Sequence, residues 1–272
     1  MFQSLRQMFG FAARERRPAI PSGQRVYAIG DIHGRLDLFD AMIAAIERDD
    51  AAGVPARTTV VLLGDLVDRG PDSAGVVARA REWQQRRTVR ILAGNHEEMF
   101  LASFDNREVL RHFLQFGGKE TLASYGIEFE TAPRKKKEFA ALQELMRQKV
   151  PEADLEFLSG LEDVVMIGGY AFVHAGILPE VPVDSQSPQD LRWIREPFLS
   201  FAEPHSHVVV HGHTVYDEAE LRENRIGIDT GAFSSGRLTA LVLEGTGRRL
   251  IQTRVTEGVV GTFARKAEAE AE

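Results

Sequence analysis

The chain has 272 residues, of which 43% are hydrophobic and 27% charged, so it can bury a sizeable core as one large domain or two small ones. Its formal net charge of −7 gives no electrostatic reason to expect a nucleic-acid partner, and the absence of cysteine excludes disulfides, thiolate nucleophiles and zinc–thiolate sites. No apolar run approaches the length that spans a bilayer, so stable membrane insertion is not expected.

Residues 1–23 are predicted to be an N-terminal extension. Apolar residues such as Phe2, Leu5 and Phe9 are interspersed there with arginines, without a continuous apolar stretch or a small-residue cleavage site. The segment therefore does not resemble a secretory signal, and we expect a cytoplasmic protein. We favour an extension that frays or docks on its own domain over an amphipathic helix that touches a membrane.

The first predicted strand, residues 25–29, ends just before two potential ligands. Asp31 and His33 are two residues apart, so in extended backbone their side chains point to the same side. Helical spacing of apolar residues then predicts a helix over residues 36–48. The resulting unit is a strand, a polar loop and a helix.

This unit occurs a second time. The apolar run 58–63 predicts a buried strand, and Asp65, Asp68 and Arg69 follow it before a predicted helix over residues 72–87. A carboxylate at the carboxyl end of such a strand lies where open α/β sheets bind their ligands.

A third unit consists of a predicted strand, residues 89–93, followed by Asn95 and His96. Three such units in succession favour βαβ connections and a parallel sheet. Because parallel strands end at the same edge of a sheet, we expect the polar residues of all three loops to lie together.

Residues 98–161 are predicted to be a mostly helical insertion or cap beside this polar edge. The run Arg134-Lys135-Lys136-Lys137 within it is interpreted as a solvated helix start, with a docking patch for an acidic or phosphorylated partner as the alternative.

The second half of the chain adds further strands that end in histidine. A hairpin with a Gly168-Gly169 turn is expected over residues 164–173, directly before His174. The strand 207–210 leads into His211 and His213. Closing strands are predicted over residues 226–231 and 238–243. Residues 259–272, rich in Ala and Glu at the end, are predicted to be a disordered tail.

Carboxylate, amide and imidazole ligands without thiolate suit manganese, iron or zinc. The sequence offers more such ligands than one metal ion can bind. Two divalent ions bridged by a carboxylate would form a site for in-line displacement at phosphorus, and their charge would reverse the local field of an acidic protein.

Five motifs in order carry a resemblance to a known family. They are Gly-Asp-Ile-His-Gly (30–34), Gly-Asp-Leu-Val-Asp-Arg-Gly (64–70), Gly-Asn-His-Glu (94–97), Val-His-Ala-Gly (173–176) and Gly-His-Thr (212–214). The set resembles the phosphoprotein phosphatase family of calcineurin-like metallophosphoesterases, and within it the bacterial branch that includes bacteriophage lambda phosphatase. The resemblance implies an α/β fold with a central β-sandwich flanked by helices and a dinuclear metal site at the strand ends. It places the catalytic domain at residues 24–258.

The resemblance also implies roles for individual residues. Asp31 and His33 would bind the first metal and Asp65 would bridge both ions. The second metal would be completed by Asn95, His174 and His213. His96, oriented by Asp68, would protonate the leaving-group oxygen, while Arg69, Arg195 and Asn95 would hold the phosphate. The metals implied are two divalent ions, manganese first, with iron or zinc as alternatives.

Two positions have competing interpretations. His211 precedes the family's ligand position by two residues, so we interpret it as an outer-shell or buried residue. Arg192 competes with Arg195 for the second phosphate clamp, and the spacing from Trp193 in the branch that the sequence resembles implies Arg195.

The resemblance implies a phosphomonoesterase that acts on phosphoserine or phosphothreonine in proteins, or on phosphotyrosine as well. It would use a hydroxide activated by the two metals for in-line attack on phosphorus. The partner would be a phosphoprotein or a small phosphoester. The alternative is a symmetrical bis(5'-nucleosyl)-tetraphosphatase, from a sister branch with nearly the same metal motifs. Asp68 and Glu97 favour the protein phosphatase, because the sister branch tends to carry Ala and Asp there.

Overall fold

The computed structural model describes residues 18–128, 131–256 and 258–267. Predictions made for residues 1–17 and 268–272 lie outside the described residues. Residues 18–20 lie against the folded domain: the Ile20 amide donates to the Gly245 carbonyl at 2.8 Å, and the Ile20 side chain is buried.

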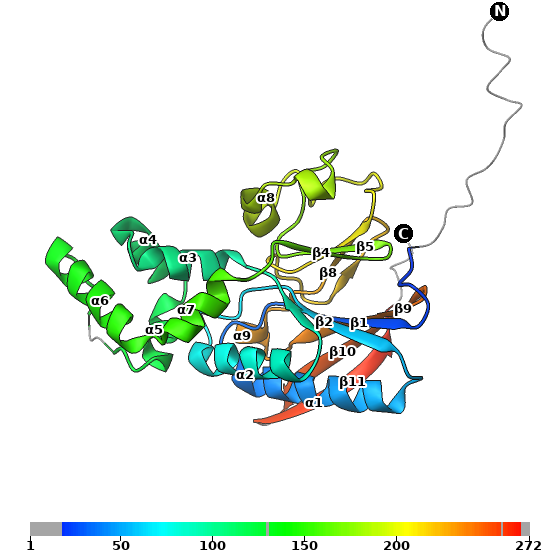
Figure 1. Ribbon diagram of the computed structural model, residues 1–272, viewed down its shortest axis with the longest axis horizontal. Coiled ribbons are helices and arrows are strands. Elements are labelled where there is room, and N and C mark those ends of the chain that lie inside the picture. Colours follow the sequence, from blue (N-terminus) through cyan, green and yellow to red (C-terminus); the bar gives the residue numbers. More distant parts are fainter. Residues whose placement is uncertain (1–17, 129–130, 257, 268–272) are drawn as a thin grey trace, which may run out of the picture.

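The fold contains two β-sheets that pack face to face (Figure 1). In spatial order, the first consists of β11 (Val259–Lys266), β10 (Gly247–Thr256), β9 (Thr239–Glu244), β1 (Gln24–Ile29), β2 (Arg57–Leu62) and β3 (Val89–Ile91). The strands β1, β2 and β3 are parallel, as the three repeated units predict.

The second sheet has the order β4 (Val164–Ile167), β5 (Tyr170–Val173), β6 (Val208–His211), β8 (Arg225–Gly227) and β7 (Glu220–Leu221). The predicted hairpin is present as the antiparallel pair β4–β5. Strands β5, β6 and β8 run parallel to each other, so the loops after them also end at one edge.

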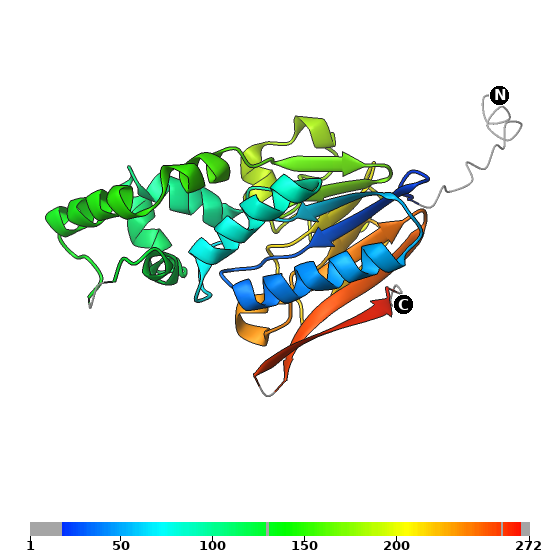
Figure 2. The same cartoon turned by 60° about the horizontal axis from the view of Figure 1, so that its bottom comes forward.

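Helices cover the outer faces of both sheets. The first sheet carries α1 (Leu36–Ala52) and α2 (Ser73–Arg86), and the second carries α8 (Pro188–Trp193) (Figures 1 and 2). A short 3₁₀ helix, η1, covers Val183–Ser185, and α9 covers Ala232–Ser235. This arrangement is the α/β sandwich flanked by helices that the family resemblance implies.

In the described part of the chain, α3, which begins just before the predicted insertion, and four helices within the insertion gather at one end of the sandwich (Figure 2). They are α3 (Asn95–Ser103), α4 (Arg107–Phe113), α5 (Gly118–Ser124), α6 (Lys136–Lys149) and α7 (Glu152–Ser159). No helix in the described part of the chain is both long and apolar enough to cross a membrane.

The alternation of residues along β1 explains the layers. Tyr27 and Ile29 belong to the core shared with α1 and α2, whereas Val26 and Ala28 belong to the core between the two sheets. Because successive strand residues point to opposite faces, one apolar strand can serve both cores. A third core lies between the second sheet and α8.

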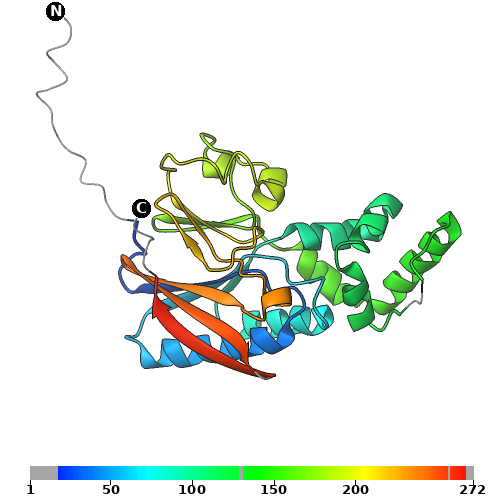
Figure 3. The same cartoon turned by 180° about the vertical axis from the view of Figure 1, so that it is seen from behind.

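The disordered tail predicted from residue 259 is wrong for residues 259–266. These residues form β11, which pairs antiparallel with β10 over eight residue pairs (Figure 3). The partly buried Val260 side chain packs on the core beneath α1, and the Arg48 side chain donates to the Thr262 hydroxyl at 3.5 Å. The strand therefore gains a backbone ladder and a packing surface that the sequence of residues 259–266 did not reveal.

Candidate active site

The strand ends bring the predicted polar residues together at one edge of the sandwich. The first sheet positions Asp31 and His33 after β1, Asp65, Asp68 and Arg69 after β2, and Asn95 and His96 after β3, whereas the second positions His174 after β5 and His213 after β6. Apart from Arg69 and His213, which keep some exposure, these side chains are buried.

The backbone at these loops is strained. Six non-glycine residues in the described part of the chain have positive φ, and five of them are predicted site residues, namely His33, Asp65, Asp68, Arg69 and His213. An L-residue in this region costs on the order of 1–2 kcal/mol, so strain concentrated here is typical of a functional site.

The carboxylate of Asp65 lies between two groups of ligands. Its Oδ2 atom is 3.5 Å from His33 Nε2 and 3.9 Å from His96 Nε2. Its Oδ1 atom is 3.5 Å from His174 Nε2 on the other side. Two sets of side chains could each hold a metal ion, His33–Asp65–His96 and Asp65–His174–His213, and Asp65 is common to both. A carboxylate common to both sets could bridge two ions.

Hydrogen bonds fix which histidine nitrogen faces the cluster. Nδ1 of His33 lies 2.8 Å from the Val67 carbonyl, and Nδ1 of His174 lies 2.8 Å from the Leu63 carbonyl. A neutral ring that donates from Nδ1 presents a lone pair at Nε2, as metal-bound histidines do. Because His174 Nε2 is also 3.0 Å from Asn95 Oδ1, electron-pair donors converge there, and this donor set fits a divalent cation.

The pKa shifts of the histidines and carboxylates in the cluster also fit a metal site. Burial lowers the pKa of His174 to about 4 and that of His213 to about 2, so both rings are neutral at pH 7. Burial also raises the pKa values of Asp31 and Asp65, because a low-polarity environment disfavours their negative charge. Divalent cations would use the neutral imidazoles and stabilise the ionised carboxylates. The cluster thus fits a dinuclear divalent metal site.

His96 and Asp68 form a buried acid–base pair. Nδ1 of His96 is 2.6 Å from Asp68 Oδ2, and Nε2 of His96 points toward the cluster. The hydroxyl of Thr121, on α5, donates to Asp68 Oδ1 at 2.6 Å. Burial lowers the pKa of His96 and raises that of Asp68. At 2.6 Å the carboxylate can orient the imidazole and, against the effect of burial, stabilise its protonated form.

Two guanidinium groups reach the cluster. Arg69 donates to His33 Nε2 at 2.8 Å and to His96 Nε2 at 3.0 Å. Arg195 donates to His213 Nε2 at 2.8 Å, whereas its competitor Arg192 is paired with Glu98 and Asp163. The geometry therefore places Arg195 at the site and occupies Arg192 elsewhere.

Asp31 belongs to neither metal set. Its carboxylate accepts from the backbone amide of His213 at 3.0 and 3.2 Å, and it lies beside Asp229. A Cβ atom on Gly212 would come within 2.0 Å of Asp31 Oδ1, so only glycine fits this approach. Burial raises the pKa of Asp229, which is hydrogen-bonded to Asp31.

Asp229 is a residue that the sequence reasoning left out of the site. It lies two residues beyond the end of β8. Because the sequence predicts a strand over residues 226–231, Asp229 does not stand out there as a residue at the end of a strand. Glu97 holds the Asp65 loop in place. Its carboxylate accepts hydrogen bonds from the amides of Asp65, Leu66 and Gly94, and thereby fixes this loop against α3.

His211 is buried against Phe198 and Tyr216, in keeping with its interpretation as a buried residue.

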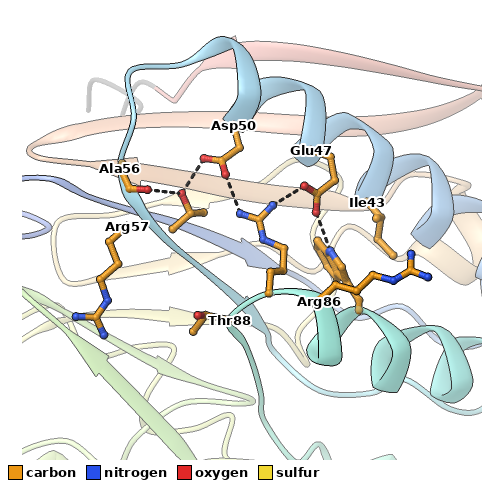
Figure 4. Close-up of a pocket in the computed structure, with 10 residues that line it drawn as sticks. Ile43, Glu47, Asp50, Ala56, Arg57, Arg86 and Thr88 are labelled. Carbon is orange, nitrogen blue, oxygen red and sulfur yellow. Dashed lines mark hydrogen bonds and ion pairs between the residues drawn. The ribbon is translucent and has the colours of Figure 1, made fainter.

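A separate hollow of ≈ 660 Å³ lies at the opposite end of the first sheet, near the start of β2 (Figure 4). Three of its charged side chains, Glu47, Asp50 and Arg87, are joined to one another by ion pairs. Arg87 pairs with Glu47 and Asp50 at 2.7 and 2.8 Å, and Thr58 donates to Asp50 at 2.7 Å. This network links α1, β2 and the end of α2.

Comparison with known proteins identifies related sequences. A family model for calcineurin-like phosphoesterases matches residues 24–230. A symmetrical bis(5'-nucleosyl)-tetraphosphatase of Acidovorax sp. (strain JS42) is 41% identical over 78 residues, 29% of this chain and 25% of that protein. The match thus spans about a quarter of that relative's length. The asymmetrical bis(5'-nucleosyl)-tetraphosphatase PrpE of Bacillus velezensis is 26% identical over 78% of this chain and 86% of the relative. Serine/threonine-protein phosphatase 1 of Salmonella typhimurium is 37% identical over 79 residues, 29% of this chain and 32% of that protein.

Solved structures share the fold at low sequence identity. A protein provisionally named a diadenosine tetraphosphatase has a TM-score of 0.58 and 22% identity, covering 89% of this chain and 94% of that chain. A cold-active protein tyrosine phosphatase has a TM-score of 0.56 and 18% identity, covering 90% of this chain and 81% of that chain. At these identities the likeness concerns the fold.

Proposed function

Because the chain belongs to the calcineurin-like phosphoesterase family, we propose that it is a metal-dependent phosphomonoesterase whose main substrates are phosphoserine and phosphothreonine in proteins. Asp31, His33, Asp65, Asn95, His174 and His213 would hold two divalent ions, manganese first. Ions held there would supply hydroxide from water at neutral pH as the nucleophile for in-line attack on phosphorus.

The chain's own residues would bind the phosphate and handle the proton. Arg69 and Arg195 offer paired N–H donors that match phosphate oxygens. Nε2 of His96 would give its proton to the leaving-group oxygen as the P–O bond breaks, while Asp68 at Nδ1 holds the ring in orientation. Asp65 would be shared by the two sets of metal ligands and would hold them next to each other.

The observation that carries this proposal is the His96–Asp68 pair at 2.6 Å. A serine or threonine alkoxide is a poor leaving group and needs protonation in the transition state, which a positioned acid accelerates by roughly 10²–10⁴-fold. A nucleoside diphosphate leaves readily as an anion and gains little from such an acid. The pair therefore favours an alcohol leaving group.

The names of the relatives favour a second candidate, a symmetrical bis(5'-nucleosyl)-tetraphosphatase. PrpE, which matches most of the chain, carries the name of a tetraphosphatase of the asymmetrical type. Cleavage of a dinucleoside tetraphosphate would use the same metals and arginines, so only the leaving group distinguishes the two candidates.

A side-by-side rate comparison in manganese tests the proposal. The full chain is given a phosphothreonine peptide and diadenosine tetraphosphate at equal concentrations, with a chelator-treated sample as control. We expect a higher kcat/KM for the peptide. A preference for the dinucleotide, with release of two diphosphates, would move the assignment to the second candidate. Absence of manganese-dependent turnover of either substrate would overturn both.

A further inference from the structure

A hollow of ≈ 690 Å³ opens directly beside the predicted phosphate clamp. Arg69 forms part of its wall, together with the apolar side chains of Leu36, Pro71 and Phe233. Arg69 also donates to His96 Nε2 at 3.0 Å, so a leaving group that His96 protonates would lie beside this wall of the hollow.

The ring of Phe233 separates the hollow from the predicted metal ligands. Its centroid is 4.6 Å from Arg69 Cζ and 5.4 Å from the centroid of the His33 ring, which it meets edge to face. The ring projects from α9, which is attached to the start of α1 by a hydrogen bond of 2.8 Å from Arg35 to the Ala232 carbonyl. Phe233 is therefore held at the border between the predicted phosphate site and the hollow.

Among the described residues, the charged side chains that line the hollow are ion-paired except for Arg69 and Asp72. Asp37 is paired with Arg35 at 2.7 Å, and Asp40 with Arg79 at 3.2 Å. Asp72 accepts a hydrogen bond from the Gly75 amide at 2.8 Å but has no ion pair with any residue in the described ranges. Once Arg69 holds the phosphate, the carboxylate of Asp72 is left to set the sign of the field.

We propose that this hollow is a leaving-group pocket, with Phe233 as its apolar wall and Asp72 as its charge selector. It would receive the peptide that carries the phosphorylated residue and prefer a neighbouring Lys or Arg over Glu or further phosphate. The proposal rests on the proposed function and narrows its substrate class to phosphoproteins with basic residues beside the phosphorylation site.

Two phosphothreonine peptides that differ only in one flanking residue, Lys or Glu, test the charge selector. At low salt we expect a kcat/KM ratio of about 10 in favour of Lys for the wild-type protein, because attraction and repulsion each contribute a few-fold. The ratio should fall toward 1 in Asp72→Asn, which keeps the helix cap while removing the charge. Added salt should also lower it.

Asp105→Asn, at an exposed ion pair with Arg147, is the matched control and should keep the wild-type ratio. Equal hydrolysis of the two peptides by the wild type, or an unchanged ratio in Asp72→Asn, would overturn the pocket while leaving the proposed function intact. Hydrolysis of diadenosine tetraphosphate but of neither peptide would overturn the proposed function itself, and the pocket with it.

Phe233→Leu tests the apolar wall separately. If the ring contacts the leaving group before and during reaction, the variant should raise KM about 3- to 10-fold for both peptides with little change in kcat. The Lys-to-Glu ratio should stay at its wild-type value. A fall in kcat at unchanged KM would overturn the wall role and make Phe233 a positioning residue for Arg69.

Discussion

His96 contacts both Asp65 and Asp68, and the two contacts predict different roles for its side chain. Nε2 of His96 lies 3.9 Å from Asp65 Oδ2, close enough for the histidine to be counted with His33 as a metal ligand. Its Nδ1 atom is bound to Asp68, which suits a proton donor. We expect His96→Asn to keep its manganese content and to lose about 100-fold or more in kcat on a phosphothreonine peptide. The loss on p-nitrophenyl phosphate should be much smaller, because that leaving group needs no proton.

Steady-state kinetics and elemental analysis of the purified variant check this prediction. His207→Asn is the control, because His207 lies before β6 and away from the strand ends that form the site. A manganese content that falls in step with activity would instead make His96 a ligand.

Most of the predicted site residues are found because they directly follow an apolar strand, and this signal depends only on neighbouring residues in the sequence. Asp31, Asp65 and His174 each follow an apolar strand, and the parallel order of the strands brings them together. Thr121 and Phe233 carry no comparable signal, since each lies on a short helix far along the chain from Asp68 and Arg69. Only the tertiary fold brings them into contact, so no local pattern could reveal them.

At the scale of elements, α5 contributes to the acid pair although it lies within the predicted insertion. The Thr121 hydroxyl donates to Asp68 Oδ1 at 2.6 Å and accepts from the Asp68 amide at 2.8 Å. We expect Thr121→Val to lower kcat about 10-fold on a phosphothreonine peptide and less than twofold on p-nitrophenyl phosphate. Thr121→Ser should restore the rate. Equal losses on both substrates would point to a general disturbance of the loop.

The attachment of α1 to the sheet gives a prediction about stability. Asp50 accepts hydrogen bonds from Arg25, Thr58 and Arg87. Burial alone would raise its pKa, but these donors outweigh burial and lower it. We expect Asp50→Asn to reduce the free energy of unfolding by about 2 kcal/mol at pH 7. Figure 4 shows Asp50 facing this network from α1.

The pH dependence follows from the direction of the shift. A carboxyl whose pKa is lower in the folded than in the unfolded protein stabilises the fold above its unfolded value, about 4, and loses that effect as pH falls through the folded value. The difference between wild type and Asp50→Asn should therefore shrink below pH 4. Urea unfolding at several pH values, in the presence of a chelator, measures this difference in the free energy of unfolding. Glu82→Gln, at an exposed pair with Arg86, should change stability by less than about 0.5 kcal/mol.

The elements that the sequence misses are those whose partners are distant or whose pattern is weak. The parallel strands and the β4–β5 hairpin carry strong apolar runs and turn residues. β10 and β11 show no sustained alternation of polar and apolar residues, and β11 exposes Val259 and Phe263. Their stability comes from the edge of β9 and from contact with α1, which composition alone does not predict.

At the scale of the molecule, the predicted metal ligands come from both sheets. Asp65 and Asn95 follow strands of the first sheet, and His174 and His213 follow strands of the second. Ions shared by these residues would join the sheets at one edge, next to buried carboxylates whose negative charge burial disfavours. Metal binding should therefore stabilise the whole domain and not only the loops.

Calorimetry with manganese and with a chelator tests this expectation. At a free manganese concentration 100 times Kd, each site adds about 2.7 kcal/mol to the folded state, which for a chain of this size raises Tm by roughly 5–10 °C. Asp65→Asn should lose most of this shift because it weakens both sites, whereas Asp105→Asn should keep it. The Asp65→Asn protein should unfold near the temperature of the chelated wild type, or slightly above it, since one buried negative charge is gone. An equal manganese-dependent shift in wild type and Asp65→Asn would mean that the ions bind elsewhere than at the Asp65 bridge.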